Sequence, residues 1–101
     1  MPETVSPPRV EDALKPARPP LHKVILLNDD YTPRNFVVRV LKAEFRMDEG
    51  SALRVMMTAH GRGSCVVAVF TREIAEEKAT RATEMAVKEG YPLRFTTEPE
   101  E

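Results

Sequence analysis

Four polar residues could together bind a ligand. Asn28, Asp29 and Asp30 directly follow the apolar run of residues 24–27, and His60 comes later in the chain. They supply an amide oxygen, two carboxylates and an imidazole, all of which can accept hydrogen bonds from a cation. A free protein N-terminus carries three such donors, and capture of a chain-terminal amine is a known recognition mode. Beside an apolar surface, this set would suit a chain start with a bulky apolar first side chain.

Each of these residues also has a simpler interpretation. Asn and Asp after a strand commonly bond to their own backbone in a turn, and a histidine near a helix end often serves only as a capping cation. The aspartates and His60 could instead hold a metal or act as acid and base. However, the sequence has no second histidine near enough to complete a metal site, and no nucleophile beside a base. We therefore expect no enzyme, no metal and no cofactor.

Three strands and three helices are predicted to position these groups. Branched apolar runs between turn residues indicate strands at 23–28, 64–70 and 93–97. Apolar residues at helical spacing indicate helices at 32–45, 48–60 and 72–89. The order β-α-α-β-α-β predicts an α+β fold, a small antiparallel three-stranded sheet with three helices packed on it. In this fold the second helix can end near the first strand, which would bring His60 toward Asn28.

Capping residues set the expected helix boundaries. Thr32 is predicted to cap the first helix, with Pro33 in its first position. Asp48 and Thr71 are predicted to cap the second and third helices, and Gly90 to end the third. The pair Met56–Met57 is expected to fill the core. The buried face of the third helix is expected to contain Ile74, Ala75, Ala79, Ala82 and Ala86.

Composition limits the organisation of the chain. It has 101 residues and a net charge of -1, which favours one domain and gives no charge pattern for nucleic acid. Residues 1–21 hold six of the nine prolines and predict a disordered arm, before a core at 22–97 and a frayed tail at 98–101. No run suits a signal peptide or a membrane span, so we expect a cytoplasmic protein. The single cysteine, Cys65, is expected to be a buried thiol.

Three segments carry a resemblance to a known family: "VILLNDDYTPRNFVVRVL", "MMTAHGRGSCVVAVFTREIAEEKA" and "YPLRFT". They resemble the ClpS family, the adaptors that deliver N-degron substrates to the AAA+ unfoldase of the Clp protease. The resemblance spans nearly all of residues 22–97, and the combination of "NDDYTP", His60 and "VFTxExAExK" is more specific than any single motif. It implies an adaptor that binds a free α-amino group followed by Leu, Phe, Tyr or Trp, with a ClpA-like unfoldase as partner.

The resemblance also implies roles for individual residues. The α-amino group and first peptide unit would be bound by Asn28, Asp29, Asp30 and His60. The pocket for the first side chain would be lined by Leu26, Leu27, Thr32, Arg34, Val37, Met56, Ala59 and Leu93. Glu73 and Lys78 would face the unfoldase, close to His60 and the loop after it, although their spacing also fits a solvated helix pair. The N-terminal arm would engage the unfoldase as well.

Two positions depart from the family pattern. Arg34 stands where the family commonly has a methionine, and that methionine helps to exclude branched side chains from the pocket. Ala59 stands where valine is usual. The preferred first residue is therefore left open, because small changes in an apolar pocket reorder similar side chains. The rival interpretation is a small interaction scaffold without an amine pocket, since the fold is similar to a ribosomal stalk domain. The acceptor cluster favours the adaptor, because a scaffold of that kind needs no amine site.

Overall fold

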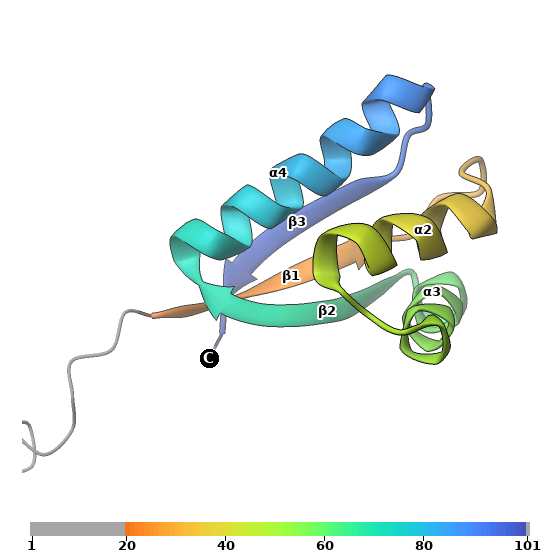
Figure 1. The fold of residues 1–101 in the computed structure, drawn as a ribbon. Helices are drawn as coiled ribbons and strands as arrows, with labels where there is room; N and C mark the ends of the chain where they lie inside the picture. The colour runs from red at the N-terminus through yellow and green to blue at the C-terminus, as the bar shows by residue number, and fades with distance from the viewer. Residues whose placement is uncertain (1–19, 101) are drawn as a thin grey trace, which may run out of the picture.

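The computed structural model describes residues 20–100, which form an antiparallel sheet of three strands with three helices (Figure 1). The elements are β1 Leu21–Leu27, α2 Arg34–Phe45, α3 Glu49–Arg62, β2 Ser64–Thr71, α4 Arg72–Glu89 and β3 Arg94–Pro99. Strand β1 is central, and β2 and β3 pair with it on either side. The predicted fold class and the predicted element order are confirmed.

The central strand supplies the floor of the core. Val24 and Leu26 are buried on one face of β1, because residues two apart in a strand point to the same side. Leu26 lies between Cys65 on β2 and Phe95 on β3. The helices complete the core with residues that include Phe36, Val37, Val40, Leu41, Ala52, Met56 and Ala59.

Helix α4 lies along the sheet through a stripe of alanines, and its bounds agree with the prediction. The buried residues of α4 are Ala75, Ala79, Ala82 and Ala86. The prediction that Ile74 belongs to this stripe is wrong, because its side chain is 43% exposed. Ile74 precedes Ala75 by one position, which turns it about 100° around the helix and away from the sheet.

Three of the predicted caps are observed, although one of them lacks its hydrogen bond. The Asp48 carboxylate accepts the Ser51 N–H at 2.7 Å, and this bond lowers the pKa of Asp48. Gly90 is left-handed, with φ of 80°, and its N–H donates to the carbonyl of Ala86. Thr71 occupies the cap position of α4 without a side-chain bond to the helix.

The predicted start of the first helix is wrong. Pro33, with φ of −60° and ψ of 140°, is the capping residue, and α2 begins at Arg34. Thr32 does not cap the helix, because its hydroxyl donates to the Asp29 carboxylate instead. Its side chain therefore holds the loop before the helix.

The strands extend beyond the predicted core at both ends. Leu21 already belongs to β1, and the remainder of the predicted arm, apart from Pro20, lies outside the described residues. Glu98 and Pro99, expected in a frayed tail, pair with Lys23 and His22. The backbone groups in the first half of β1 need hydrogen-bond partners on the β3 side, which explains why β3 continues to Pro99. No helix within residues 20–100 has the length and apolar character needed to cross a bilayer.

Candidate functional site

A cavity of about 310 Å³ opens where β1 ends and the chain turns toward α2. Its wall combines the end of β1, the loop after it, the start of α2, the last turns of α3 and the residue before β3. The lining residues are Leu26, Leu27, Asn28, Asp29, Asp30, Tyr31, Thr32, Pro33, Arg34, Val37, Met56, Ala59, His60 and Leu93. The structure therefore brings together every residue that the sequence predicted for the amine site and the apolar pocket.

The inner wall of this cavity is apolar. The side chains of Leu26, Val37, Met56, Ala59 and Leu93 come from four different elements or loops, and all five are at most 7% exposed. They are fixed because the same residues belong to the hydrophobic core. An apolar side chain that enters the cavity would therefore meet a preformed surface.

Asp29 fixes the shape of the loop at the cavity mouth. Its Oδ1 accepts the backbone N–H groups of Tyr31 at 2.8 Å and Thr32 at 2.7 Å. Its carboxylate also accepts the Thr32 hydroxyl, at 2.9 Å to Oδ2. These bonds match the turn interpretation of Asp29 and orient the loop that carries Asp30.

Asn28 and Asp30 present polar groups at the same mouth. The Asn28 N–H donates to the carbonyl of Gly63 at 2.9 Å, which ties the end of β1 to the end of α3. Asp30 is exposed. Within residues 20–100, neither the Asn28 amide group nor the Asp30 carboxylate has a hydrogen-bond partner of its own. Both side chains can accept hydrogen bonds from a ligand.

His60 lies on the opposite side of the mouth and contacts Arg34. The distance from Arg34 Nη2 to His60 Nε2 is 3.4 Å. A guanidinium group can only donate, so Nε2 is the atom that would accept in a hydrogen bond between these two side chains. His60 is not the terminal cap of α3, because the helix continues to Arg62 and Gly63 closes it with φ of 95°. Arg34 therefore covers one edge of the cavity.

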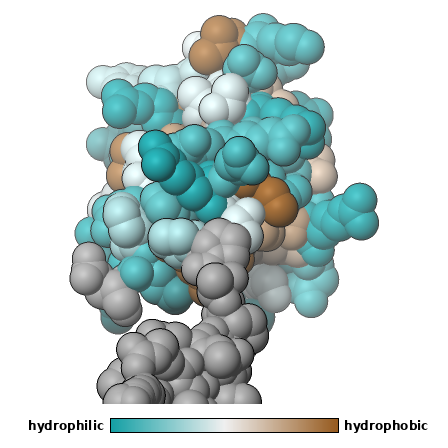
Figure 2. All heavy atoms as spheres, turned by 90° about the vertical axis from the view of Figure 1, so that its left-hand side faces the viewer, coloured by the Kyte–Doolittle hydropathy of each residue, from teal (hydrophilic) through white to brown (hydrophobic). Residues whose placement is uncertain are grey.

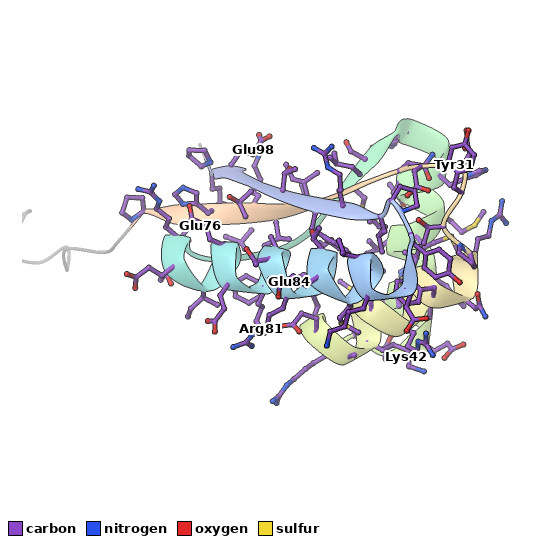
Figure 3. All side chains as sticks on the ribbon, turned by 90° about the horizontal axis from the view of Figure 1, so that it is seen from above. Tyr31, Lys42, Glu76, Arg81, Glu84 and Glu98 are labelled. Atoms are coloured by element: carbon purple, nitrogen blue, oxygen red, sulfur yellow. The ribbon has the colours of Figure 1, made fainter. Side chains whose placement is uncertain are left out.

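Glu73 lies at a distance from this cavity. In the strand pairing, Leu21 faces Thr71 at one end and Leu27 faces Ser64 at the other. The cavity is at the Leu27 end, whereas Glu73 follows Thr71, so the length of β1 separates them by about 20 Å. Figure 3 shows Tyr31 at one end of the sheet and Glu76 and Glu98 at the other. The prediction that Glu73 lies near His60 is wrong, because β2 runs the length of the sheet between the end of α3 and the start of α4.

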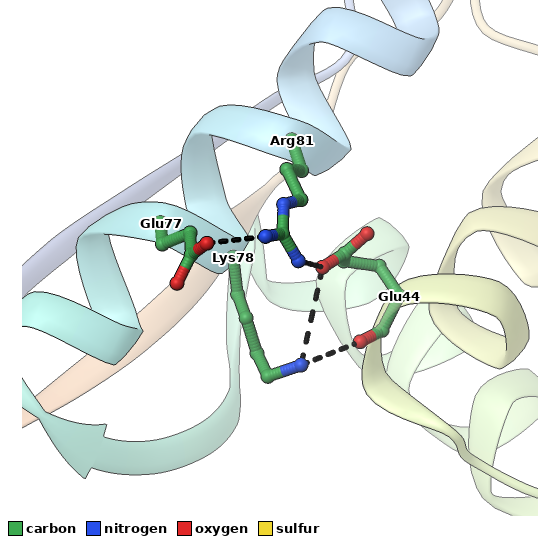
Figure 4. A network of polar contacts seen from close by, with 4 residues as sticks. All are labelled: Glu44, Glu77, Lys78 and Arg81. Atoms are coloured by element: carbon green, nitrogen blue, oxygen red, sulfur yellow. Dashed lines mark hydrogen bonds and ion pairs between the residues drawn. The ribbon is translucent and has the colours of Figure 1, made fainter.

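Lys78 is engaged with the end of α2. Its Nζ donates to the Glu44 carbonyl at 3.1 Å and lies 3.9 Å from the Glu44 carboxylate (Figure 4). It also lies 5.6 Å from the centre of the Phe70 ring. Glu73 is exposed on the first turn of α4. The two residues therefore differ in how available they are to a partner.

Sequence reasoning did not assign Tyr31 or Pro33 to the cavity, although both belong to the motif that it identified. It also placed Met57 in the core, whereas this side chain is 49% exposed. Cys65 is half-buried, and burial raises the pKa of its thiol. Among residues 20–100, no group of three His, Cys, Asp or Glu side chains is placed to hold a metal ion.

Comparison with known proteins shows the family. The family described as ATP-dependent Clp protease adaptor protein ClpS matches residues 17–96. The chain belongs to the ClpS family. ClpS 1 of Bradyrhizobium diazoefficiens, named an ATP-dependent Clp protease adapter protein, is 62% identical over 101 residues, which cover all of both chains. ClpS 1 of Rhodopseudomonas palustris is 68% identical over 88 residues, or 87% of this chain and 85% of the relative.

A solved ClpS structure is also similar to this chain. It is that of Agrobacterium tumefaciens ClpS2 bound to L-phenylalaninamide, with 64% sequence identity and a TM-score of 0.81. The match covers 82% of this chain and all of the ClpS2 chain. The chain is therefore a member of a family of Clp protease adaptors, and the fold of a ligand-bound ClpS is close to its own.

Proposed function

We propose that this protein is an adaptor for N-degron substrates, which it binds at the cavity and delivers to a ClpA-like AAA+ unfoldase. Its ligand would be a free α-amino group on a bulky hydrophobic first residue, namely Leu, Phe, Tyr or Trp. The observation that carries the proposal is an apolar cavity with unpaired acceptors at its mouth. The ligand of the similar ClpS2, L-phenylalaninamide, combines an apolar side chain with an amine and supports the same chemistry.

The proposed roles follow from the geometry of the wall. The Asn28 amide oxygen and the Asp30 carboxylate would accept hydrogen bonds from the ammonium group and first peptide unit, and His60 Nε2 would accept one in place of its contact with Arg34. Asp29 would contribute mainly by holding the loop, because its carboxylate already has backbone partners. Leu26, Leu27, Thr32, Arg34, Val37, Met56, Ala59 and Leu93 would surround the first side chain.

The free energies expected for these interactions are large enough for a micromolar complex. Burial of a Leu or Phe side chain contributes about 1.5–3 kcal/mol. Each hydrogen bond to the charged amine adds on the order of 1.5–3 kcal/mol. Two or three such bonds and one filled pocket approach the ~8 kcal/mol of a micromolar complex, after the cost of association is subtracted. Acetylation of the amine should abolish most of this affinity, because it removes the charge and a donor.

The direct test is a fluorescence titration with a labelled peptide that begins with Leu or Phe. Asp30→Ala or His60→Ala should each weaken binding at least tenfold, and acetylated peptide should fail to compete. Glu84→Ala is a matched control, because it removes an exposed carboxylate from α4, outside the cavity wall. Unchanged affinity in both site variants would refute the proposed site.

Delivery would use the other end of the molecule. The end at which α4 begins is largely hydrophilic, so it can stay exposed to water when no partner is bound (Figure 2). We assign Glu73 and Lys78 to the unfoldase contact, together with the N-terminal arm.

Glu73→Ala is the cleaner variant for testing this contact, because Lys78 also contacts Glu44. It should lower unfoldase-dependent degradation of a Phe-initiated reporter and leave peptide affinity unchanged, as should deletion of residues 1–20. Full delivery by both variants would contradict this assignment.

A further inference from the structure

A second and larger hollow, which we call the α2–α3 groove, adjoins the cavity. Its volume is about 790 Å³, and it shares Arg34 and Met56 with the first cavity. The wall of the α2–α3 groove consists of Arg34, Asn35, Val38, Arg39, Lys42, Ala43, Glu49, Leu53, Met56 and Met57. The two hollows therefore border each other at Arg34 and Met56, so a peptide chain that leaves the first passes the second once it crosses these side chains.

The floor of the groove is apolar and exposed. Leu53 and Met57 are 42% and 49% exposed and lie four residues apart on α3, so they share one face of that helix. Val38 and Met56 are buried beside them. An exposed apolar strip bordered by polar residues is typical of a binding surface.

The rim of the groove has an excess of positive charge. Lys42 and Glu49 neutralise each other, with Nζ 2.7 Å from Oε1. Arg34 lies against the imidazole of His60, with Nη2 3.4 Å from Nε2, and Arg39 lies 5.1 Å from the centre of the Phe36 ring. Within residues 20–100, neither arginine forms an ion pair. The described rim therefore offers two cationic groups to a partner with carboxylates.

We propose that the α2–α3 groove binds the substrate residues that follow the first one and selects acidic side chains among them. This inference rests on the proposed function. Along α2, Arg34 and Lys42 are eight residues apart, or about 12 Å, which is the span of three to four residues of extended chain. Acidic side chains at the third and fifth positions would meet Arg34 and Arg39. An apolar residue between them would pack on Leu53 and Met57.

The test compares three peptides that begin with Phe and a free amine, carry Leu at position four and differ only at positions three and five. These positions hold Glu, Gln or Lys. At low salt, the Glu peptide should bind about fivefold more tightly than the Gln peptide, and the Lys peptide should bind most weakly. The differences should shrink as salt is added, since both arginines are exposed. Equal affinities for the three peptides would overturn the proposal.

Groove variants then locate the effect. Arg39→Gln should reduce the preference for Glu over Gln to within twofold, whereas Arg39→Lys should retain most of it. Lys88→Gln is the matched control, because it removes an exposed positive charge from α4 and should leave the preference unchanged. Leu53→Ser should weaken binding of the Glu peptide without affecting L-phenylalaninamide, which is too short to reach the groove. A preference that persists in Arg39→Gln, or an affinity for the Glu peptide that is unchanged in Leu53→Ser, would contradict the assignment to this groove.

The same titrations separate the two proposals. If no Phe-initiated peptide binds, or if acetylated peptides bind equally well, the proposed function fails. If the free amine is required but the residues at positions three and five have no effect, only the groove proposal fails. A second copy of the chain is the competing occupant. Concentration-dependent self-association that Leu53→Ser abolishes and the Glu peptide does not displace would assign the groove to that copy and overturn the proposal.

Discussion

The cavity mouth and the junction of α2 with α4 use similar polar side chains in opposite ways. At the junction, the largely buried Glu44 carboxylate lies 3.9 Å from Lys78 and 3.6 Å from Arg81, and Arg81 also contacts Glu77 (Figure 4). At the mouth, Asn28 and Asp30 have no side-chain partner within the described residues. The charges at the junction satisfy one another, whereas the mouth retains free acceptors.

This difference separates structural from ligand-binding roles. A charge that is removed from water needs a partner, so the paired groups at the junction stabilise the fold. Exposed acceptors beside an apolar cavity contribute little to folding and can serve a ligand. Asp29 belongs to both categories, because it lines the cavity and yet bonds to the backbone of its own loop. Variants at these places can test the distinction.

The largest effect is expected from Asp29→Ala. This change removes the acceptor of two backbone N–H groups and the Thr32 hydroxyl, so the loop that carries Asp30 loses its fixed shape. The free energy of unfolding should fall by about 1–3 kcal/mol, and peptide affinity should fall more than tenfold. Denaturant unfolding and peptide titration measure the two effects. Asp30→Asn is the paired control, which should weaken binding without changing stability; an equally stable Asp29→Ala protein would show that the loop does not depend on these bonds.

Glu44→Gln is expected to have a smaller effect, which lowers the stability of the fold and leaves peptide binding intact. It leaves Lys78 and Arg81 without the carboxylate that links α2 to α4. The free energy of unfolding should fall by about 1 kcal/mol, while peptide affinity stays within twofold of the original. Glu84→Gln, on the exposed face of α4, is the stability control. A large loss of peptide binding in Glu44→Gln would remove the distinction between the two regions.

The smallest effect concerns the reactivity of Cys65, which lies opposite Leu26 in the sheet, beside the cavity floor. Burial raises the pKa of this thiol, so less thiolate forms at pH 8 than in an unfolded chain. Alkylation by iodoacetamide should be a few-fold slower in the folded protein than in denaturant. Asp29→Ala should increase the rate slightly and Glu44→Gln should not. A rate that is equal in the folded and denatured chain would show that the floor is open to solvent.

Much of the fold was predictable because local patterns and packing agree. Branched apolar runs specified the strands, and helical periodicity with Asp48 and Gly90 specified two of the helix ends. The cavity wall was also anticipated, since the resemblance named the residues that now line it. These features depend on residues whose local preferences and tertiary positions coincide.

The remaining features depend on particular side-chain contacts and on strand direction, which local propensity does not specify. Thr32 has the chemistry of a helix cap, but the nearby Asp29 carboxylate takes its hydroxyl. The contact between Arg34 and His60 joins two helices and has no signature in either segment alone. The position of Glu73 depends on the direction of β2, which local sequence does not encode. Spacing along the chain was therefore a poor guide to distance across the sheet.

The bond between Asn28 N–H and the Gly63 carbonyl has a wider consequence. It joins the end of β1 to the end of α3, on two sides of the cavity mouth, through main-chain atoms. The left-handed Gly63 that closes α3 supplies the carbonyl. The side chains that face the opening are not needed for this joint. Apart from Asp29, which holds the loop, those side chains can therefore be exchanged by evolution or engineering to change selectivity, while the main-chain link between the two sides of the mouth is kept.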